Sequence, residues 1–389
     1  MPALALNRWL LRTALSLPTP ILRAFSGGAA VHRGGRTLDP RFQFLSQAAL
    51  SAALPDSVED ARRAAAQSLS LVAGDLATDV RIEDIGIDGP GGDLRLRAYR
   101  VERPDPEAPL LVYAHSGGGV IGDLEACHAA CSILAATTRS AVLSVDYRLA
   151  PEHRFPAGLE DMIAGWRWAC EHAGRFGAKS GTAAVGGDSR GANFAAVLCQ
   201  EMKRLEAPQP ALQLLIYPPL DIASETPSMA LYGDGPFASR ARRSWLQDNY
   251  LGAQADPGDP RLSPGRSQDL AGLAPAIIVG AGFDPLVDQG LDYARALIGA
   301  GVTTTYRCYD SLPHGFVGYT GAVPAARDAV EQIGRLAREG YGRLLPSPSG
   351  LSRGPIHPPH RSKRLGRSSA TSSAPSVTLT HGSSGQARG

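Results

Sequence analysis

The 389-residue sequence is short of acidic residues at both ends, of lysine throughout and of cysteine. No Asp or Glu occurs in residues 1–38 or after Glu339, and Lys179, Lys203 and Lys363 are the only lysines. The 5 cysteines are too few, and odd in number, for a disulfide framework, which favours a reducing compartment such as the cytoplasm. No uncharged apolar run reaches the roughly 18 residues of a membrane span, so the sequence predicts no spanning helix.

Composition and charge exclude several further classes of protein. Hydrophobic residues make up 43% of the chain and charged residues 20%, which is typical of a globular protein and excludes collagen-like and coiled-coil chains. The net charge of +2 gives no electrostatic reason to expect a nucleic-acid partner. The partner that we expect is a small molecule.

The two ends differ from the middle of the chain. In residues 1–38, arginines alternate with Trp9 and leucines, which favours a basic amphipathic extension packed on the body of the protein. A membrane-surface helix or a targeting segment is the alternative. Residues 346–389 are rich in Ser, Pro, Gly and Arg and have few apolar side chains, so we expect a disordered tail. The folded domain would then be residues 39–345.

In that domain, β-rich runs alternate with helical patterns, which predicts an α/β fold with a mostly parallel, doubly wound sheet. The predicted strands are residues 94–101, 110–114, 141–145, 182–185, 212–217, 276–279 and 303–309. Ligands of such sheets bind beyond the carboxyl ends of the strands. Residues 39–77 and 221–262 fall outside the alternation and could form a lid there.

The first chemical motif is Gly187-Asp188-Ser189-Arg190-Gly191, between a predicted strand and a predicted helix. Glycines two residues before and after a serine permit the sharp turn that exposes its hydroxyl above the sheet. Ser189 is therefore the candidate nucleophile.

A serine nucleophile needs a histidine base and an acid that orients the histidine. Asp284 and His314 follow Ser189 in that order, and each comes just after a predicted strand. Both would lie at the same sheet edge as Ser189. Asp288, four residues after Asp284, is the second candidate for the acid.

A glycine-rich loop follows another predicted strand, in His115-Ser116-Gly117-Gly118-Gly119. Backbone N–H groups freed in such a loop can bind the oxyanion formed when a carbonyl is attacked. The candidate donors are the amides of Gly117, Gly118 and Arg190.

The same loop supports a rival interpretation. Gly117-x-Gly119-x-x-Gly122 matches the dinucleotide fingerprint, and Asp146 ends the next predicted strand. Asp146 lies rather far from the last glycine, however. A nicotinamide site would also leave Ser189, Asp284 and His314 without a role.

Five blocks together resemble the hormone-sensitive lipase family of α/β-hydrolase esterases, with a likeness to its bacterial members. The blocks are residues 115–123, 146–152, 187–191, 284–286 and 314–316, and the likeness runs from about residue 39 to residue 339. The resemblance implies a serine carboxylic ester hydrolase with Ser189, Asp284 and His314 as its triad, and no metal or organic cofactor. It also implies that residues 39–77 and 221–262 form a helical cap.

The chain departs from the family pattern at three positions. Ser116 replaces a glycine, Gly119 stands where an aromatic residue is usual, and Arg190 replaces a small residue. We expect the oxyanion hole to survive, and Arg190 to alter substrate preference. The functional hypothesis is hydrolysis of short- to medium-chain esters through an acyl-enzyme. The alternatives are a catalytically impaired small-molecule binding protein and a lactone or amide hydrolase that uses the same triad.

Overall fold

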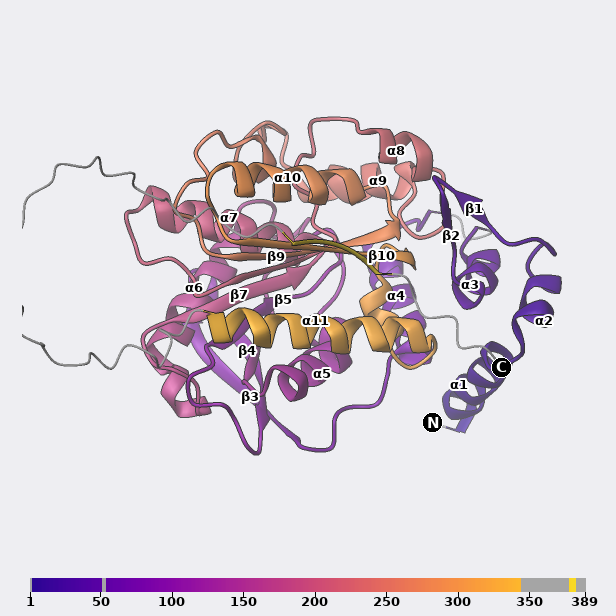
Figure 1. Cartoon of the computed structure of the whole chain (residues 1–389), viewed down its shortest axis with the longest axis horizontal. Helices are drawn as coiled ribbons and strands as arrows, with labels where there is room; N and C mark the ends of the chain where they lie inside the picture. The colour runs from indigo at the N-terminus through magenta and orange to yellow at the C-terminus, as the bar shows by residue number, and fades with distance from the viewer. Residues whose placement is uncertain (1, 51–53, 344–377, 383–389) are drawn as a thin grey trace, which may run out of the picture.

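A nine-stranded sheet forms the centre of the molecule (Figure 1). The computed structural model describes residues 2–50, 54–343 and 378–382. In order across the sheet, the strands are β11 (Thr378–Gly382), β10 (Thr304–Pro313), β9 (Ala276–Phe283), β8 (Gln213–Ile216), β7 (Ala183–Asp188), β5 (Leu110–Ala114), β6 (Val142–Val145), β4 (Gly92–Val101) and β3 (Val80–Gly89). Every neighbouring pair from β11 to β6 is parallel, whereas β4 pairs antiparallel with β6 and β3. The predicted mostly parallel α/β fold is confirmed.

Helices cover both faces of this sheet (Figure 1). One face carries α6 (Ala157–His172), α7 (Arg190–Arg204) and α10 (Val287–Gly299), and the other carries α5 (His128–Thr138) and α11 (Pro324–Arg343). Successive side chains of a strand point to opposite faces. On β5, Leu110 and Val112 therefore join the hydrophobic cluster under α6 and α7, while Leu111 and Tyr113 join the cluster under α5 and α11.

β3 has no counterpart among the predicted strands. Its isoleucines, Ile82, Ile85 and Ile87, are separated by acidic residues or by a glycine, so this edge strand carries no continuous apolar run. It is held by antiparallel pairing with β4 along its whole length, from Val80 opposite Val101 to Gly89 opposite Gly92. The short turn between β3 and β4 places the two strands side by side for this pairing.

The N-terminal residues form two helices that lie against the body, α1 (Pro2–Leu15) and α2 (Thr19–Ala24). The Arg8 guanidinium donates to the Ala73 carbonyl at 2.7 Å and pairs with Asp75 at 3.2 Å, while Leu15 is buried. These contacts fix the inner face of α1. Within residues 2–50, 54–343 and 378–382, no helix combines the length and the apolar character needed to cross a membrane.

Most of the predicted tail, residues 346–389, lies outside the described residues. Residues 378–382 depart from the prediction of disorder, because they form β11 and pair in parallel with Thr305 to Tyr309 of β10. An uncovered edge strand presents free N–H and C=O groups, which a further strand can satisfy. The alternating threonines and leucine of this segment suit a strand.

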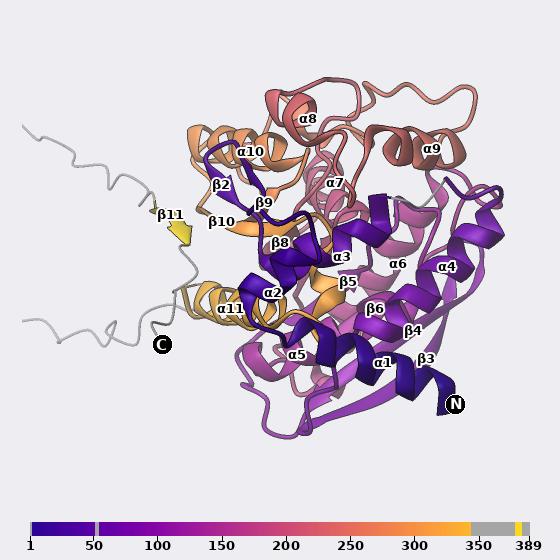
Figure 2. The same cartoon turned by 90° about the vertical axis from the view of Figure 1, so that its right-hand side faces the viewer.

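The remaining elements gather at the carboxyl ends of the parallel strands. They are the hairpin of β1 (His32–Arg33) and β2 (Arg36–Thr37), the helices α3 (Pro40–Leu50), α4 (Val58–Val72), α8 (Pro227–Tyr232) and α9 (Arg240–Tyr250), and the 3₁₀ turns η1 (Leu124–Cys127), η3 (Pro264–Arg266) and η4 (Phe316–Tyr319). A further turn, η2 (Ala173–Phe176), follows α6. Figure 2 looks onto this end, with α3, α4 and α9 in front of the sheet. The proposed cap segments, 39–77 and 221–262, contain these three helices.

Candidate active site

The turn from β7 into α7 holds Ser189 in a strained backbone conformation, with φ of +52°. The flanking glycines make this turn possible. A Cβ on Gly187 would lie 2.4 Å from the Gly191 carbonyl carbon, and a Cβ on Gly191 would lie 1.9 Å from the Ala114 carbonyl oxygen. Any larger residue would push the turn away from β5. Close packing therefore requires glycine at both positions of the motif. The resulting turn presents the Ser189 hydroxyl at the N-terminus of α7.

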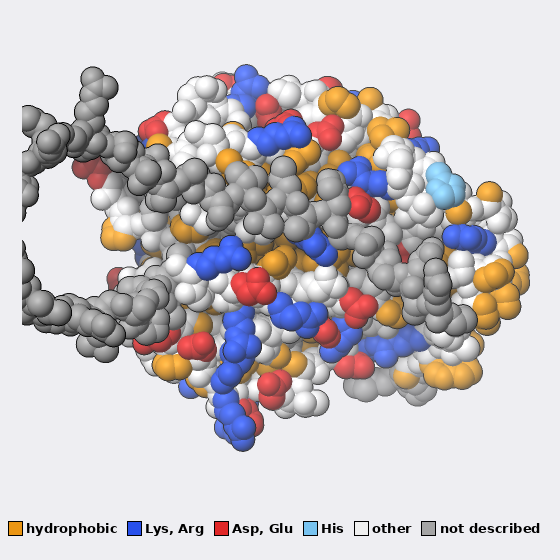
Figure 3. All heavy atoms as spheres, viewed as in Figure 1, with side chains coloured by type: hydrophobic (Ala, Val, Ile, Leu, Met, Phe, Trp, Pro, Cys, Tyr) orange, Lys and Arg blue, Asp and Glu red, His pale blue; other side chains and the backbone are white. Residues whose placement is uncertain are grey.

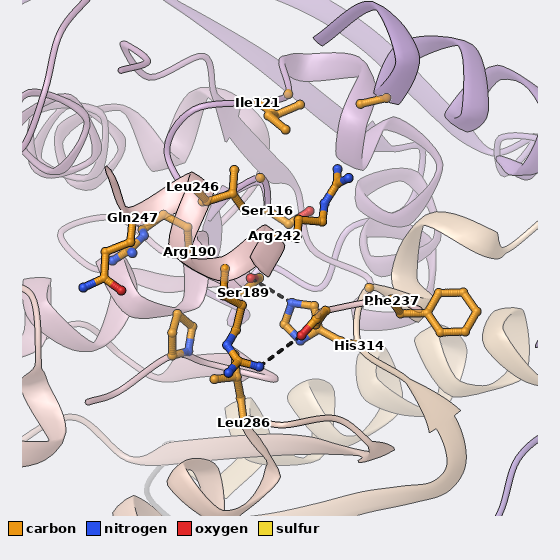
Figure 4. Close-up of a pocket in the computed structure, with 18 of the residues that line it drawn as sticks. Ser116, Ile121, Ser189, Arg190, Phe237, Arg242, Leu246, Gln247, Leu286 and His314 are labelled. Carbon is orange, nitrogen blue, oxygen red and sulfur yellow. Dashed lines mark hydrogen bonds between the residues drawn. The ribbon is translucent and has the colours of Figure 1, made fainter. Parts of the chain in front are cut away.

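His314 lies between Ser189 and Asp284. Its Nε2 is 3.0 Å from Ser189 Oγ, and its Nδ1 is 2.7 Å from Asp284 Oδ2 (Figure 4 shows Ser189 and His314). Asp284 is fully buried, and its other oxygen accepts the Leu286 N–H at 2.8 Å. The three side chains come from the ends of β7, β9 and β10, which lie in one sheet. They have the hydrogen-bond geometry of a nucleophile, a base and an orienting acid.

The glycine-rich loop after β5 adopts left-handed backbone conformations next to Ser189. Gly117 has φ of +114° and Gly118 has φ of +71°, and a Cβ on Gly117 would lie 1.9 Å from the Ile121 carbonyl oxygen. No group in the described ranges accepts a hydrogen bond from the amides of these two glycines. The Arg190 amide opens α7, where helix N–H groups have no intrahelical acceptor. These are the three amides expected to bind an oxyanion.

Asp188, the residue before the nucleophile, forms a buried network that the sequence did not reveal. Its carboxylate accepts the Tyr113 hydroxyl at 3.0 Å and the Tyr217 hydroxyl at 2.9 Å. Burial raises the pKa of Asp188, and the hydrogen bonds from Tyr217, Ser116 and Tyr113 oppose that shift. The Tyr217 ring also packs 4.7 Å from the His314 ring, centre to centre. The network thus links the nucleophile turn to the base.

The residues of the rival interpretations have structural contacts instead. Asp288 accepts the Ser228 N–H at 2.7 Å and so joins α10 to α8. Asp146 forms a 2.6 Å ion pair with Arg95. The loop after β5 leads into the short turn η1, and a Cβ on Gly122 would lie 2.6 Å from His115 Nδ1. Its glycines therefore serve close packing at this place, and the loop does not open directly into an α-helix as a dinucleotide site would.

Two of the three departures from the family pattern, Gly119 and Arg190, meet at Tyr250. A Cβ on Gly119 would lie 2.5 Å from Tyr250 Cε2, so Tyr250 fills the space on that side of the loop. The Arg190 guanidinium lies 4.4 Å from the centre of the Tyr250 ring and donates to Asn193 Oδ1 at 3.1 Å. Tyr250 and Asn193, rather than the acidic Asp188, are therefore its close contacts.

A cavity of about 520 Å³ opens onto these groups. Ser189, His314, Gly117 and Gly118 line it from the sheet side. The proposed cap segment 39–77 contributes Arg62 and Leu69 of α4 to the lining. The segment 221–262 contributes Phe237, and Arg242, Leu246 and Gln247 of α9 (Figure 4). The cavity is large enough for a small ester and places it against the serine hydroxyl.

The comparisons with known proteins agree with this geometry. A family model described as an α/β hydrolase fold matches residues 111–318. Carboxylic ester hydrolase LipN of Mycobacterium tuberculosis is 42% identical over 311 residues, which cover 77% of this chain and 82% of LipN. The chain belongs to the hormone-sensitive lipase-like esterases.

Other relatives in this esterase family are similar over most of their length. Ethyl acetate hydrolase of Pseudomonas putida is 34% identical over 71% of this chain and 88% of its own. A hyperthermophilic esterase from Pyrobaculum calidifontis is 33% identical, covers 79% of this chain and 99% of its own, and superimposes with a TM-score of 0.73. The family resemblance predicted from the five sequence blocks is confirmed.

Proposed function

We propose that this member of the esterase family hydrolyses short- to medium-chain carboxylic esters through an acyl-enzyme formed on Ser189. The observation that carries the proposal is the position of His314, within 3.0 Å of Ser189 Oγ and 2.7 Å of Asp284 Oδ2. The names of the relatives, which are esterases and carboxylic ester hydrolases, support the same activity. The alternative of a binding protein without activity is not favoured.

In the proposed mechanism, Ser189 Oγ attacks the acyl carbon and gives its proton to His314 Nε2. Asp284 accepts a hydrogen bond from Nδ1–H, which keeps Nε2 free to take that proton and stabilises the imidazolium. The amides of Gly117, Gly118 and Arg190 bind the oxyanion. The alcohol then leaves with the proton from His314, and a water activated by the same nitrogen hydrolyses the acyl-enzyme. A lactone or amide would follow the same steps.

The test is turnover of a chromogenic ester series from acetyl to palmitoyl by the wild type and by Ser189→Ala. We expect serine-dependent hydrolysis that is fastest with short to medium chains, since the cavity volume is about 520 Å³. Folded wild type that hydrolyses none of the esters, or a Ser189→Ala variant as active as the wild type, would contradict the proposal.

A matched pair of variants tests the acid. Asp284→Asn should lower kcat by about 10⁴, the loss expected when the histidine takes the wrong tautomer. Asp288→Asn, four residues later, should lower it far less, because Asp288 contacts the Ser228 backbone and not His314. Equal losses in the two variants would contradict the assignment.

We further propose peripheral contact between a lipid surface and the outer faces of α1 and α2 in a cytoplasmic protein. The five cysteines are all free, which fits a reducing compartment. Trp9 is 61% exposed and Phe25 is 70% exposed, with Leu6 and Leu10 beside Trp9 on α1. Figure 3 shows hydrophobic side chains gathered at the right-hand end of the molecule, where α1 and α2 lie. Residues 1–38 carry no acidic residue, so an anionic lipid surface would be the favoured one.

A further inference from the structure

Arg190, the residue after the nucleophile, carries a buried guanidinium. Arg190 is 5% exposed, and it lines the cavity next to Ser189. Its Nη1 donates to the neutral Asn193 amide, its guanidinium lies over the Tyr250 ring, and its Nε has no hydrogen-bond partner in the described part of the chain. None of these contacts supplies a negative charge. Because a buried charge without a counter-charge is costly, an anionic group bound in the cavity would stabilise it.

The guanidinium is also held in a fixed place. Tyr250, at the end of α9, lies against Gly119 so closely that a Cβ there would be 2.5 Å from its ring. The same ring supports the Arg190 guanidinium at 4.4 Å. The glycine at 119 therefore makes room for the tyrosine that positions the arginine at 190. The two departures from the family pattern are physically coupled, and they leave Arg190 preorganised for binding.

α9 adds two further cations to the cavity. Arg242 and Arg243 both line it, and neither takes part in an ion pair among the described residues. Arg243 Nη1 donates to the Ala238 carbonyl at 3.0 Å. In Figure 4, Arg190 and Arg242 lie on the two sides of Ser189. An ester at Ser189 would therefore lie in a positive field from more than one direction.

Among the described residues, the acidic side chains that line the cavity form no ion pair with Arg190, Arg242 or Arg243, although Glu225 attracts the Arg243 guanidinium. Asp221 pairs with Arg266 at 3.2 Å, and Glu225 pairs with Arg240. Asp123 is exposed, and its carboxylate accepts the Glu125 N–H at 2.9 Å, where it caps η1. The positive charges of Arg190 and Arg242 therefore have no ion-pair partner in the described part of the chain and are left for a ligand.

We propose that the cavity selects esters that carry a carboxylate, with Arg190 as the residue that recognises the carboxylate and Arg242 and Arg243 adding to the attraction. This inference rests on the proposed esterase function and names its substrate class. A guanidinium donates two parallel N–H groups in the geometry that a carboxylate accepts, which suits this role better than a lysine ammonium.

Two substrates of equal shape and different charge test the proposal. One is the 4-nitrophenyl monoester of adipic acid, which ends in a carboxylate. The other is 4-nitrophenyl 6-methylheptanoate, in which an uncharged isopropyl group replaces that carboxylate. The readout is the ratio of kcat/KM for the charged ester to that for the uncharged ester, after subtraction of the enzyme-free rates. A general loss of activity cancels in this ratio.

We expect the wild type to favour the charged ester at least tenfold. Arg190→Met, which keeps the length of the side chain and removes its charge, should lower the ratio at least tenfold, and Arg190→Lys should restore part of it. Arg295→Gln is the matched control, because Arg295 is an exposed arginine of α10 that pairs with Asp292 and does not line the cavity. If Arg190→Met does not fold, Arg243→Gln should lower the ratio in the same direction.

Two outcomes would overturn the proposal while the esterase function stands. One is a wild type that prefers the uncharged ester. The other is a ratio of kcat/KM values that neither Arg190→Met nor Arg243→Gln changes. If the folded wild type hydrolyses neither ester, the esterase function fails, and binding then decides the substrate class. Calorimetric titration of Ser189→Ala with monomethyl adipate should give binding that Ser189→Ala/Arg190→Met weakens at least tenfold. Equal binding by both variants, or no binding by either, would overturn the carboxylate site.

Discussion

At the scale of single residues, the site depends on how closely the Ser189 turn approaches β5. A strained φ at a nucleophile persists only when its surroundings hold it. Here two glycines permit β7, α7 and β5 to meet, and the Asp188 carboxylate is held from beneath by two tyrosine hydroxyls. The position of the Ser189 hydroxyl is therefore sensitive to a single methyl group.

Gly191→Ala tests that sensitivity. The added Cβ would lie 1.9 Å from the Ala114 carbonyl oxygen, so the turn must move and Ser189 Oγ must shift relative to His314. We expect kcat to fall at least about 100-fold, as displacements near 1 Å do at reacting groups, and the melting temperature to fall as well. Gly299→Ala, at the end of α10 with nothing within 4 Å of its Cβ, should leave both nearly unchanged. Activity within threefold of wild type for Gly191→Ala would count against the packing argument.

His115 should make the protein less stable in mild acid. Its ring is fully buried and stacks on Tyr147, and burial lowers its pKa below the ordinary value of 6.5. The unfolded chain then binds a proton more readily than the folded one once the pH falls below about 6.5. The contribution of neutral, buried His115 to the free energy of unfolding is thus complete above about pH 6.5. It is lost as the pH falls toward the pKa of His115 in the folded protein, by up to about 1.4 kcal/mol per pH unit.

Urea unfolding at pH 7.5 and pH 5.5 measures this dependence. We expect the free energy of unfolding to fall less between the two pH values in His115→Gln than in the wild type. His153→Gln is the control, because His153 is exposed whereas His115 is buried. The same pH dependence in wild type and His115→Gln would exclude His115 as the cause.

At the scale of elements, helix α4 is clamped to the oxyanion loop by Arg62. Its Nε donates to the Val120 carbonyl and its Nη2 to the Ala150 carbonyl, each at 2.9 Å. The guanidinium also makes two 2.8 Å contacts with the Glu152 carboxylate and holds the pKa of Glu152 at about 2. One side chain thus joins a proposed cap segment to the loop that carries Gly117 and Gly118.

Arg62→Met should therefore loosen the oxyanion loop. We expect kcat to fall about tenfold for every ester in the series, a fraction of the 10²–10³ that one lost oxyanion donor costs. Arg63→Met is the control, because Arg63 is the next residue of α4 and, among the residues that the structure describes, pairs only with Glu59 and Asp60 of the same helix. If both variants keep wild-type kcat, the clamp does not position the loop.

At the scale of the whole molecule, α1 and α2, with their apolar outer surface, lie at the end of the molecule toward which the parallel strands point (Figure 2). α1 contacts α4, and α4 contributes Leu69 and neighbouring residues to the cavity lining. A lipid surface bound by α1 and α2 would therefore lie on the same side as the cap helices. Such an arrangement would bring an enzyme to esters that partition into a membrane.

Co-sedimentation with vesicles tests that contact. We expect the wild type to bind phosphatidylglycerol vesicles better than phosphatidylcholine vesicles, and the triple variant Leu6→Gln/Trp9→Gln/Leu10→Gln to lose at least tenfold in binding. Leu205→Gln, an exposed leucine after α7, is the control. Wild type that binds neither kind of vesicle would rule out the lipid contact.

The sequence alone determined the fold class, the family and the candidate site. Ser189, Asp284 and His314 could be predicted because each follows a strand, and the carboxyl ends of parallel strands meet at one edge whatever the details of packing. The glycines around Ser189 and in the loop after β5 could also be recognised, because the local backbone geometry requires them. β3 and β11 could not be predicted in this way, because edge strands take their pairing from a partner strand.

Only the tertiary structure decided which side chains surround the reacting groups. Tyr113 of β5 and Tyr217, just after β8, meet Asp188. Arg62 reaches the oxyanion loop from a helix 58 residues earlier, and Tyr250 fills the space beside Gly119. No local pattern records such contacts, because they join residues far apart in the chain. They explain how a chain with a glycine at 119 and an arginine at 190 keeps its candidate site assembled. They also support the proposal that its substrate carries a carboxylate.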